Sequence, residues 1–227
     1  NNFEGLRSYL AGVQRLGILW DDLDDFDADE LRIANESRMQ LDESSTKVKL
    51  DQLDVITPDR VKTLAKELSF ELHPHESLII MGASGTGKSS VLRTIAGLWP
   101  SGPGSLERPA LNHTMFLPQR PYMVPGSLRD QLRYPYPDRG VDDNEIRKVV
   151  EKVNLADVLA RVDSDLDRVI DWANILSLGE QQRVAFARLF LRHPQFAFLD
   201  EATSALDEDN QNRLYKLIRE SGIGFIS

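Results

Sequence analysis

The stretch SLIIMGASGTGKSSVLRTIAGLW, from Ser77 to Trp99, decides the fold. Its first part, SLIIM at 77–81, is a short continuous apolar run, which predicts a strand covered on both faces. GASGTGKS follows at 82–89 and matches the pattern G-x-x-x-x-G-K-[ST], after which the chain turns directly into a helical run. This order of strand, glycine-rich loop and helix is the context that a phosphate-binding loop requires.

The glycine-rich loop is predicted to hold the phosphates of a nucleotide. Its glycines let backbone N–H groups curl around phosphate oxygens without Cβ clashes, and the dipole of the following helix adds to the attraction. Lys88 is expected to reach the β- and γ-phosphates, and the Ser89 hydroxyl to bind Mg²⁺. The predicted ATP-binding residues here are Gly82, Ala83, Ser84, Gly85, Thr86, Gly87, Lys88, Ser89 and Ser90.

A second motif that points to a nucleotide site is FAFLDEATSALD, from Phe196 to Asp207. An apolar strand that ends in Asp200 places a carboxylate at the carboxyl edge of a parallel sheet, where open α/β folds bind their ligands. Asp200 is suited to hold Mg²⁺, directly or through water. Glu201, one residue on, is placed to polarise a water for attack on the γ-phosphate.

Strands alternate with helices along the chain after about Val48, which predicts an α/β fold with a mainly parallel sheet. Further strands are expected in 47–57, 68–72, 113–119 and 224–227, and further helices around 127–133, 142–153, after Gly179 and in 208–221. No internal repeat is visible.

Residues 1–46 differ from the rest of the chain in their composition and in their pattern of apolar residues. Apolar residues at helical spacing predict one amphipathic helix in 1–20, and the acidic run DDLDDFDADE at 21–30 opens a polar stretch that we interpret as a solvated linker. This opening is typical of a piece cut from a longer polypeptide. We therefore divide the chain into a helix and linker at 1–46 and a domain at 47–227.

Composition excludes several classes of function. A net charge of −9 argues against a nucleic-acid-binding surface, because neutralising phosphates takes clustered Lys and Arg. The sequence has no cysteine, so disulfides and thiolate metal sites are excluded. No apolar run approaches the ~20 residues of a membrane span, so the chain itself is expected to be soluble, although it could be part of something that is not.

A third motif, LSLGE at 176–180, opens a strongly helical run and forms a second candidate anion site. With all three motifs in this order, the chain resembles the nucleotide-binding domain of an ATP-binding cassette (ABC) transporter from about Val48 to Ser227. GASGTGKS resembles Walker A, Gln119 the Q-loop glutamine, LSLGE the signature LSGGQ, FAFLDE Walker B, and SALD the D-loop.

The resemblance implies a P-loop NTPase core, an antiparallel β subdomain, and a helical signature subdomain at about 120–180 that touches a membrane domain. It implies an ATPase whose catalytic residues are Glu201, Gln119 and Lys88 and whose metal ligands are Ser89, Gln119 and Asp200. Gln119 would also contact the nucleotide and the attacking water.

A narrower resemblance is carried by GLWPSGPG, LPQRPYMVPGSLRDQLRYP and DWANILSLGEQQR. These segments are similar to the subfamily of peroxisomal fatty-acyl half-transporters (subfamily D) and its bacterial relatives. That arrangement implies a membrane domain before the cassette in one polypeptide, with the cassette on the cytoplasmic side of the membrane. For Tyr122 and Trp172 taken alone, ordinary core packing is the simpler interpretation.

Two anion sites on different helices cannot both bind one nucleotide's phosphates within a single chain. A two-fold dimer resolves this, because it places the signature of one protomer over the phosphate loop of the other. We therefore expect a homodimer bridged by ATP, which hydrolysis loosens. The residues expected to contact ATP in trans are Ser177, Leu178, Gly179 and Glu180.

Three departures from the family pattern stand out. Leu178 replaces the usual glycine, so either the backbone needs no positive φ there or close approach to the phosphate is reduced. The aromatic residue on which adenine usually stacks is missing, since only Phe70 lies between Val48 and Gly82, and adenine is expected near Thr57. The sequence also stops before the family's switch histidine, from which we expect Mg-ATP binding with poor hydrolysis.

Two alternatives remain beside a transport ATPase. One is a soluble ABC ATPase of chromosome or repair type, which would need a long coiled-coil insertion that this sequence lacks. The other is a degenerate cassette that acts as a nucleotide-gated interaction module, which the intact Lys88, Asp200 and Glu201 argue against and Leu178 mildly favours.

Overall fold

The segment around the glycine-rich loop forms a strand, a loop and a helix. The protein is described by a computed structural model for residues 39–58, 60–99, 102–135 and 140–227, so the helix and linker expected in 1–38 lie outside the described residues. Strand β4 (Ser77–Leu78) leads through the loop into helix α3 (Lys88–Ile95).

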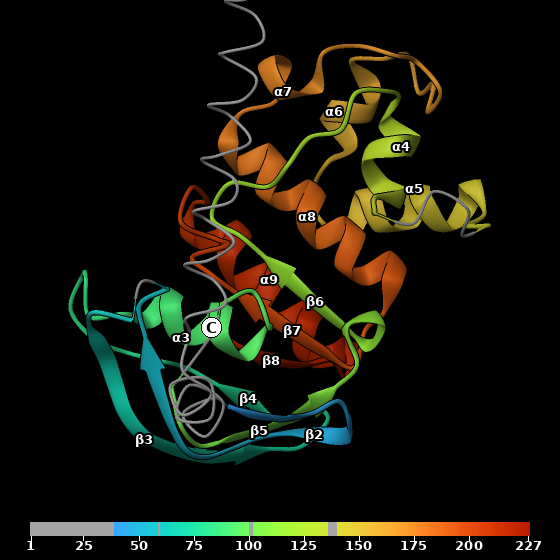
Figure 1. The fold of residues 1–227 in the computed structure, drawn as a ribbon. Helices are drawn as coiled ribbons and strands as arrows, with labels where there is room; N and C mark the ends of the chain where they lie inside the picture. The colour runs from blue at the N-terminus through green and yellow to red at the C-terminus, as the bar shows by residue number, and fades with distance from the viewer. Residues whose placement is uncertain (1–38, 59, 100–101, 136–139) are drawn as a thin grey trace, which may run out of the picture. The chain divides into compact units, whose positions relative to one another are not determined.

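Strand β4 belongs to a four-stranded sheet in which every pairing is parallel (Figure 1). The strand order is β4-β8-β7-β6, with β6 (Thr114–Leu117), β7 (Phe196–Leu199) and β8 (Gly224–Ile226). The predicted parallel α/β core is therefore confirmed. The phosphate-binding motif and the Asp200 motif both follow strands of this sheet at their carboxyl ends.

The prediction for SLIIM was wrong in one respect, because this segment is not covered on both faces. Leu78 and Ile80 pack against the core, whereas Ile79 is 59% exposed and Met81 is 88% exposed. β4 is an edge strand of the sheet, and within the part of the chain that the structure describes nothing covers its second face. A short apolar run does not by itself distinguish one covered face from two.

The two faces of the parallel sheet are packed by alternate residues of β7. Phe196 and Phe198 face a core that includes α3, while Ala197 and Leu199 face a core that includes α8 (Leu178–Arg192) and α9 (Glu208–Ser221). Strand side chains alternate between faces, so each face has its own apolar set. This sandwich fixes the loops at the carboxyl ends of the strands, where the site lies.

A second sheet packs on the other side of α3 and has mostly antiparallel pairings. It contains β1 (Gln40–Asp42), β2 (Ser44–Ile56), β3 (Thr63–Leu72) and β5 (Ser105–Pro109) in the order β1-β5-β2-β3. β2 is antiparallel to β3 and β5, and only β1 pairs in parallel with β5. Residues 40–46, which we expected to be linker, thus form strands of this sheet.

Short helices gather around α8, as Figure 1 shows. They are α4 (Leu128–Arg133), α5 (Asp143–Lys152), α6 (Ala156–Ala160) and α7 (Trp172–Ile175), and a 3-10 turn, η1 (Leu111–His113), precedes β6. Trp172 is buried, and its indole N–H donates to the Gly126 carbonyl oxygen at 3.1 Å. These helices match the helical subdomain that the resemblance implied.

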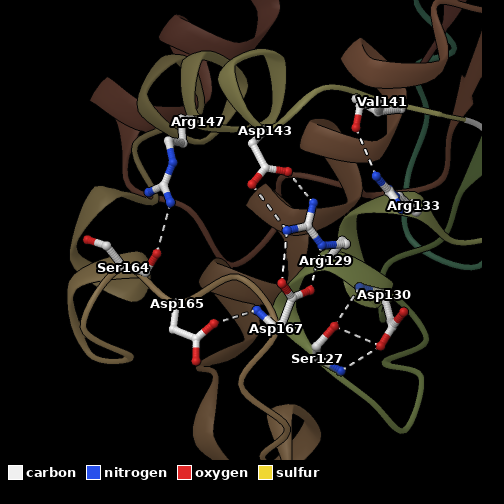
Figure 2. A network of polar contacts seen from close by, with 10 residues as sticks. All are labelled: Ser127, Arg129, Asp130, Arg133, Val141, Asp143, Arg147, Ser164, Asp165 and Asp167. Carbon is white, nitrogen blue, oxygen red and sulfur yellow. Dashed lines mark hydrogen bonds and ion pairs between the residues drawn. The ribbon is translucent and has the colours of Figure 1, made fainter.

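Arg129 joins three segments of this helical region (Figure 2). From α4, its guanidinium donates to Asp167 at 2.6 and 3.0 Å and also pairs with Asp143 at the start of α5. Hydrogen bonds from Arg129 hold the pKa values of Asp143 and Asp167 below their usual range, and the two carboxylates raise the pKa of Arg129. The network fixes α4, α5 and the loop before α7 to one another.

Candidate nucleotide site

The loop between β4 and α3 is shaped by two glycines in the left-handed region. Gly85 has φ 79° and Gly87, the N-cap of α3, has φ 98°. Inside the loop, the Lys88 ammonium donates to the carbonyl oxygens of Gly82 at 2.9 Å and Ala83 at 2.8 Å. The sequence therefore folds locally into a cradle with a cation at its centre.

Gly87 also permits a close approach from the second sheet. A Cβ atom at Gly87 would lie 3.2 Å from the Cβ of Leu64, so β3 packs directly against the phosphate loop. Residues 82–86 are themselves exposed. An exposed glycine-rich backbone that opens a helix provides free N–H donors for an anion. These residues fit the phosphates of a nucleotide.

A candidate metal-binding set lies where α3 meets the end of β7. The guanidinium of Arg93 donates to Asp200 at 3.2 Å, and the Asp200 side chain is almost fully buried. Ser89 precedes Arg93 by four residues, which places both on the same face of α3. Arg93 thus connects this face of α3 to Asp200, and hydroxyl and carboxylate oxygens such as those of Ser89 and Asp200 are hard donors that suit Mg²⁺.

Gln119 and Glu201 meet although they are far apart in the sequence. Gln119 follows β6 and Glu201 follows β7, and the Gln119 amide donates to Glu201 Oε2 at 2.8 Å. Glu201 is exposed and has φ 49°, a left-handed conformation that costs a non-glycine residue about 1–3 kcal/mol. Such strain is common at functional sites, and here it accompanies the pairing of the Glu201 carboxylate with Gln119.

Ser177 and Glu180 form a capping box at the start of α8. Ser177 Oγ accepts from the Glu180 amide at 3.2 Å, and the Glu180 carboxylate accepts from the Ser177 amide at 2.8 Å and pairs with Arg161. Burial raises the pKa of Glu180, but Arg161 and Ser177 outweigh this and hold it below its usual range. The Glu180 side chain is thus engaged within the cap, where it bonds both the backbone and the side chain of Ser177.

Leu178 and Gly179 of the signature have different structural contexts. Leu178 is the first residue of α8 and is not in the left-handed region, so the backbone needs no positive φ at this position. Gly179 is needed for close approach instead, because a Cβ atom there would lie 2.9 Å from the Ala205 carbonyl oxygen. Of the two explanations that the sequence left open for Leu178, the first fits the backbone.

The predicted site residues fall into two groups. At the carboxyl ends of the parallel strands, Gln119 contacts Glu201 and Arg93 of α3 contacts Asp200, while Lys88 and Ser89 are the first residues of α3. In the described ranges, no hydrogen bond or ion pair joins residues 177–180 to the loop at 82–89. Arg93 and Gln182 were not predicted as site residues, although each lies one helical turn from a predicted site residue.

The adenine position has partial support from the fold. Phe70 packs against the core that contains α3, so it is not a free surface on which a base could stack. The turn that begins at Thr57 connects β2 to β3, and β3 contacts the phosphate loop through Leu64. The expectation that adenine lies near Thr57 stays a prediction.

Comparison with known proteins decides the family. The sequence model of the ABC transporter family matches residues 65–204, which is more than half of the chain. The chain belongs to the ABC transporter family. Its matched region contains the phosphate loop, Gln119, the signature and Asp200, so it is the ATP-binding, ATPase domain of this family.

Three relatives, two of them named as D family members, match over most of the chain. An uncharacterized ABC transporter ATP-binding protein of Synechocystis sp. is 42% identical over 231 residues, covering 100% of this chain and 35% of the relative. The mouse lysosomal cobalamin transporter ABCD4 is 42% identical over 194 residues, covering 81% of the chain and 32% of the relative. The chloroplastic ABC transporter D family member 2 of Arabidopsis thaliana is 35% identical over 288 residues, covering 99% of this chain and 41% of the relative.

The chain spans only about a third to two fifths of the length of these relatives. Among the described residues, no helix combines the length and the apolar character that crossing a membrane requires. The match is therefore to the ATP-binding part of transporter proteins.

Proposed function

We propose that this ABC domain binds Mg-ATP, hydrolyses it within a dimer, and so drives transport across a membrane. The observation that carries this proposal is the hydrogen bond between Gln119 and Glu201 beside the buried Asp200. It joins the Gln119 amide to the Glu201 carboxylate, the residue next to Asp200, at the carboxyl ends of two adjacent parallel strands. The carboxyl edge of a parallel sheet is where open α/β folds bind their ligands, so polar side chains that gather there favour a binding site over a purely structural role.

Each residue has a distinct chemical role in this proposal. Lys88 and the N–H groups of 82–89 bind the phosphates, and Ser89 and Asp200 hold Mg²⁺, with Gln119 as a further oxygen ligand. Mg²⁺ would neutralise charge on the β- and γ-phosphates. Glu201 accepts a hydrogen bond from the attacking water and orients it toward the γ-phosphate, and Gln119 fixes the Glu201 carboxylate.

The second half of the site comes from another copy of the chain. Ser177 is the N-cap of the 15-residue helix α8, and the N-terminus of such a helix favours an anion. A two-fold pair would bring these groups to the γ-phosphate bound by the other protomer. Glu180 would act through the cap that orients Ser177, and Leu178 would turn toward protein.

A membrane domain is the proposed second partner, on the same full-length polypeptide. An apolar groove of about 430 Å³ lies between the end of α3, β6 and α8. Tyr122, which we expected in the core, lines this groove and is 60% exposed, as is Leu98. Because Tyr122 follows Gln119 by three residues, a helix docked in the groove would act directly on the segment that carries Gln119.

Replacing Lys88 with alanine tests the nucleotide site. Hydrogen bonds to charged groups contribute about 1.5–3 kcal/mol, so we expect the Kd for Mg-ATP to rise at least about tenfold in a titration. Lys148→Ala, which removes an exposed lysine of α5, is the matched control and should leave Kd unchanged. Equal affinity in the Lys88 variant and the wild type would contradict the assignment of the loop.

The degenerate-module alternative makes the opposite prediction for turnover. It requires ATP binding without hydrolysis in the full-length protein, despite the pairing of Gln119 with Glu201. Phosphate release from the full-length protein, abolished by Glu201→Gln, separates the two functions. No observation on the described residues favours the alternative.

A further inference from the structure

Gln182 is a fully buried polar side chain whose amide reaches two separate loops. Its Nε2 donates to the Gln119 carbonyl oxygen at 2.9 Å and to Ser204 Oγ at 3.2 Å. Its Oε1 accepts from the Ala205 amide at 3.1 Å. One side chain of α8 thus ties the loop after β6 to the loop after β7.

The peptide groups of Ala205 are held against α8 on both sides. The Ala205 N–H donates to Gln182. The Ala205 carbonyl oxygen lies so close to Gly179 that a Cβ atom at Gly179 would be 2.9 Å from it. Gly179 lies one turn before Gln182 on the same face of the helix. A shift of the α8 N-terminus therefore moves residues 204–205 with it.

The other end of the link reaches the hydrolytic pair. Gln182 fixes the main chain of Gln119, and the side chain of Gln119 donates to Glu201 at 2.8 Å. The Ser204 amide in turn donates to the Glu201 carbonyl oxygen at 3.0 Å. Glu201 is therefore held from both directions by groups that Gln182 binds.

We propose that Gln182 is a positioning residue that sets the geometry of the Gln119–Glu201 pair and ties it to the signature end of α8. Anion binding at Ser177 would then be transmitted through one buried amide to the hydrolytic carboxylate of the same protomer. This inference rests on the proposed ATPase function. Gln182 touches no substrate and acts only through Gln119 and residues 204–205.

Only glutamine supplies the required hydrogen bonds at this length. The contacts need two donated bonds and one accepted bond from a single side-chain amide. Methionine matches the length but supplies none of these bonds, and glutamate keeps the acceptor while losing both N–H donors. The two substitutions therefore disrupt the same link by different chemistry.

The test is a double-mutant cycle on ATP hydrolysis by the full-length protein. Gln182→Met should lower kcat about tenfold or more while leaving the KM for ATP within about twofold, because misplacing a catalytic group affects turnover rather than nucleotide binding. In a Gln119→Ala background, where only the link through residues 204–205 still reaches Glu201, Gln182→Met should lower kcat by a clearly smaller factor than in the wild type. Gln182→Glu provides a second variant with the same expected pattern.

Gln181 is the matched control, because it is the neighbouring glutamine on α8. Its amide donates only to the carbonyl oxygens of Ala173 and Leu176, which precede the helix. Gln181→Met should therefore change kcat by the same factor with and without Gln119→Ala.

The outcomes separate this inference from the function on which it rests. If Gln182→Met lowered kcat by the same factor in the wild type and in Gln119→Ala, or raised the KM for ATP as much as it lowered kcat, the role of Gln182 would be merely structural. Either result would overturn the inference but leave the proposed ATPase function in place. Absence of hydrolysis by the wild-type full-length protein would instead overturn the proposed function and the inference together. Non-additive losses confined to kcat support the inference.

Discussion

Gly97 joins the phosphate-loop helix to the neighbouring sheet. It follows the C-cap of α3 with φ 74°, and a Cβ atom there would lie 2.6 Å from a guanidinium nitrogen of Arg108. Arg108 comes from β5, is 1% exposed and pairs with Glu43 at 2.8 Å. The glycine in GLW is thus required by a buried arginine that links α3, β5 and the start of β2.

Gly97→Ala should lower the free energy of unfolding by about 1–3 kcal/mol, because the alanine adds left-handed strain and displaces a buried guanidinium. Chemical denaturation measures the loss. Gly140→Ala is the control, since a Cβ atom at Gly140 meets nothing within 4 Å and its φ is not left-handed. Its effect should stay within about 0.5 kcal/mol. Similar losses in the two variants would contradict this account of Gly97.

Leu178 is the second residue whose substitution tests the site. Because it already adopts helical backbone angles at the start of α8, restoring the family's glycine relieves no strain. We expect Leu178→Gly to leave the ATPase rate of the full-length protein within about threefold and to lower stability by up to ~1 kcal/mol, the cost of glycine in a helix. A many-fold rise in ATPase activity would instead show that Leu178 obstructs the phosphate contact.

Among the elements, the helices around α8 depend on Arg129. Arg129→Met should lower the denaturant midpoint at pH 7, because it separates α4 from Asp143 and Asp167 (Figure 2). Both carboxyl pKa values are depressed in the folded protein, so their contribution is present above about pH 4 and is lost as the pH falls through the folded values. The midpoint difference between variant and wild type should therefore narrow in acid.

Arg168→Met is the control for this pH series. Arg168 pairs with Asp163 alone, at 3.1 Å and on the surface, and exposed pairs of this kind contribute little. Its midpoint should match that of the wild type at every pH. If Arg129→Met gave a constant offset down to acid pH, the loss would come from packing and not from the two carboxylates.

The order of strands and helices followed from the sequence because the motifs sit at fixed places in a parallel α/β fold. The strand ending at Asp200 and the helix after Gly87 formed as predicted. β5 was missed because SLERP shows no clear alternation, and β1 was missed because QLD is too short to show any. Gln182 was not predicted because its role depends on loops that are distant in sequence.

At the scale of the whole molecule, the two candidate anion sites belong to separate parts of the fold. The loop at 82–89 leads into α3, while Ser177 is the N-cap of α8, around which the short helices gather (Figure 1). In the part of the chain that the structure describes, no hydrogen bond or ion pair joins them. Two copies are the simplest way to bring both kinds of site to one γ-phosphate.

Glu201→Gln should therefore trap a dimer of the chain when Mg-ATP is present. The substitution keeps the side-chain volume but removes the carboxylate that orients water, so the γ-phosphate that bridges the copies persists. Analytical ultracentrifugation should show dimer with Mg-ATP and monomer with Mg-ADP, because only ATP carries the bridging group. Adding Lys88→Ala to the same chain should restore the monomer with either nucleotide. A folded Glu201→Gln chain that stays monomeric in saturating Mg-ATP would refute the two-copy site, since nothing would then hold the signature over a phosphate.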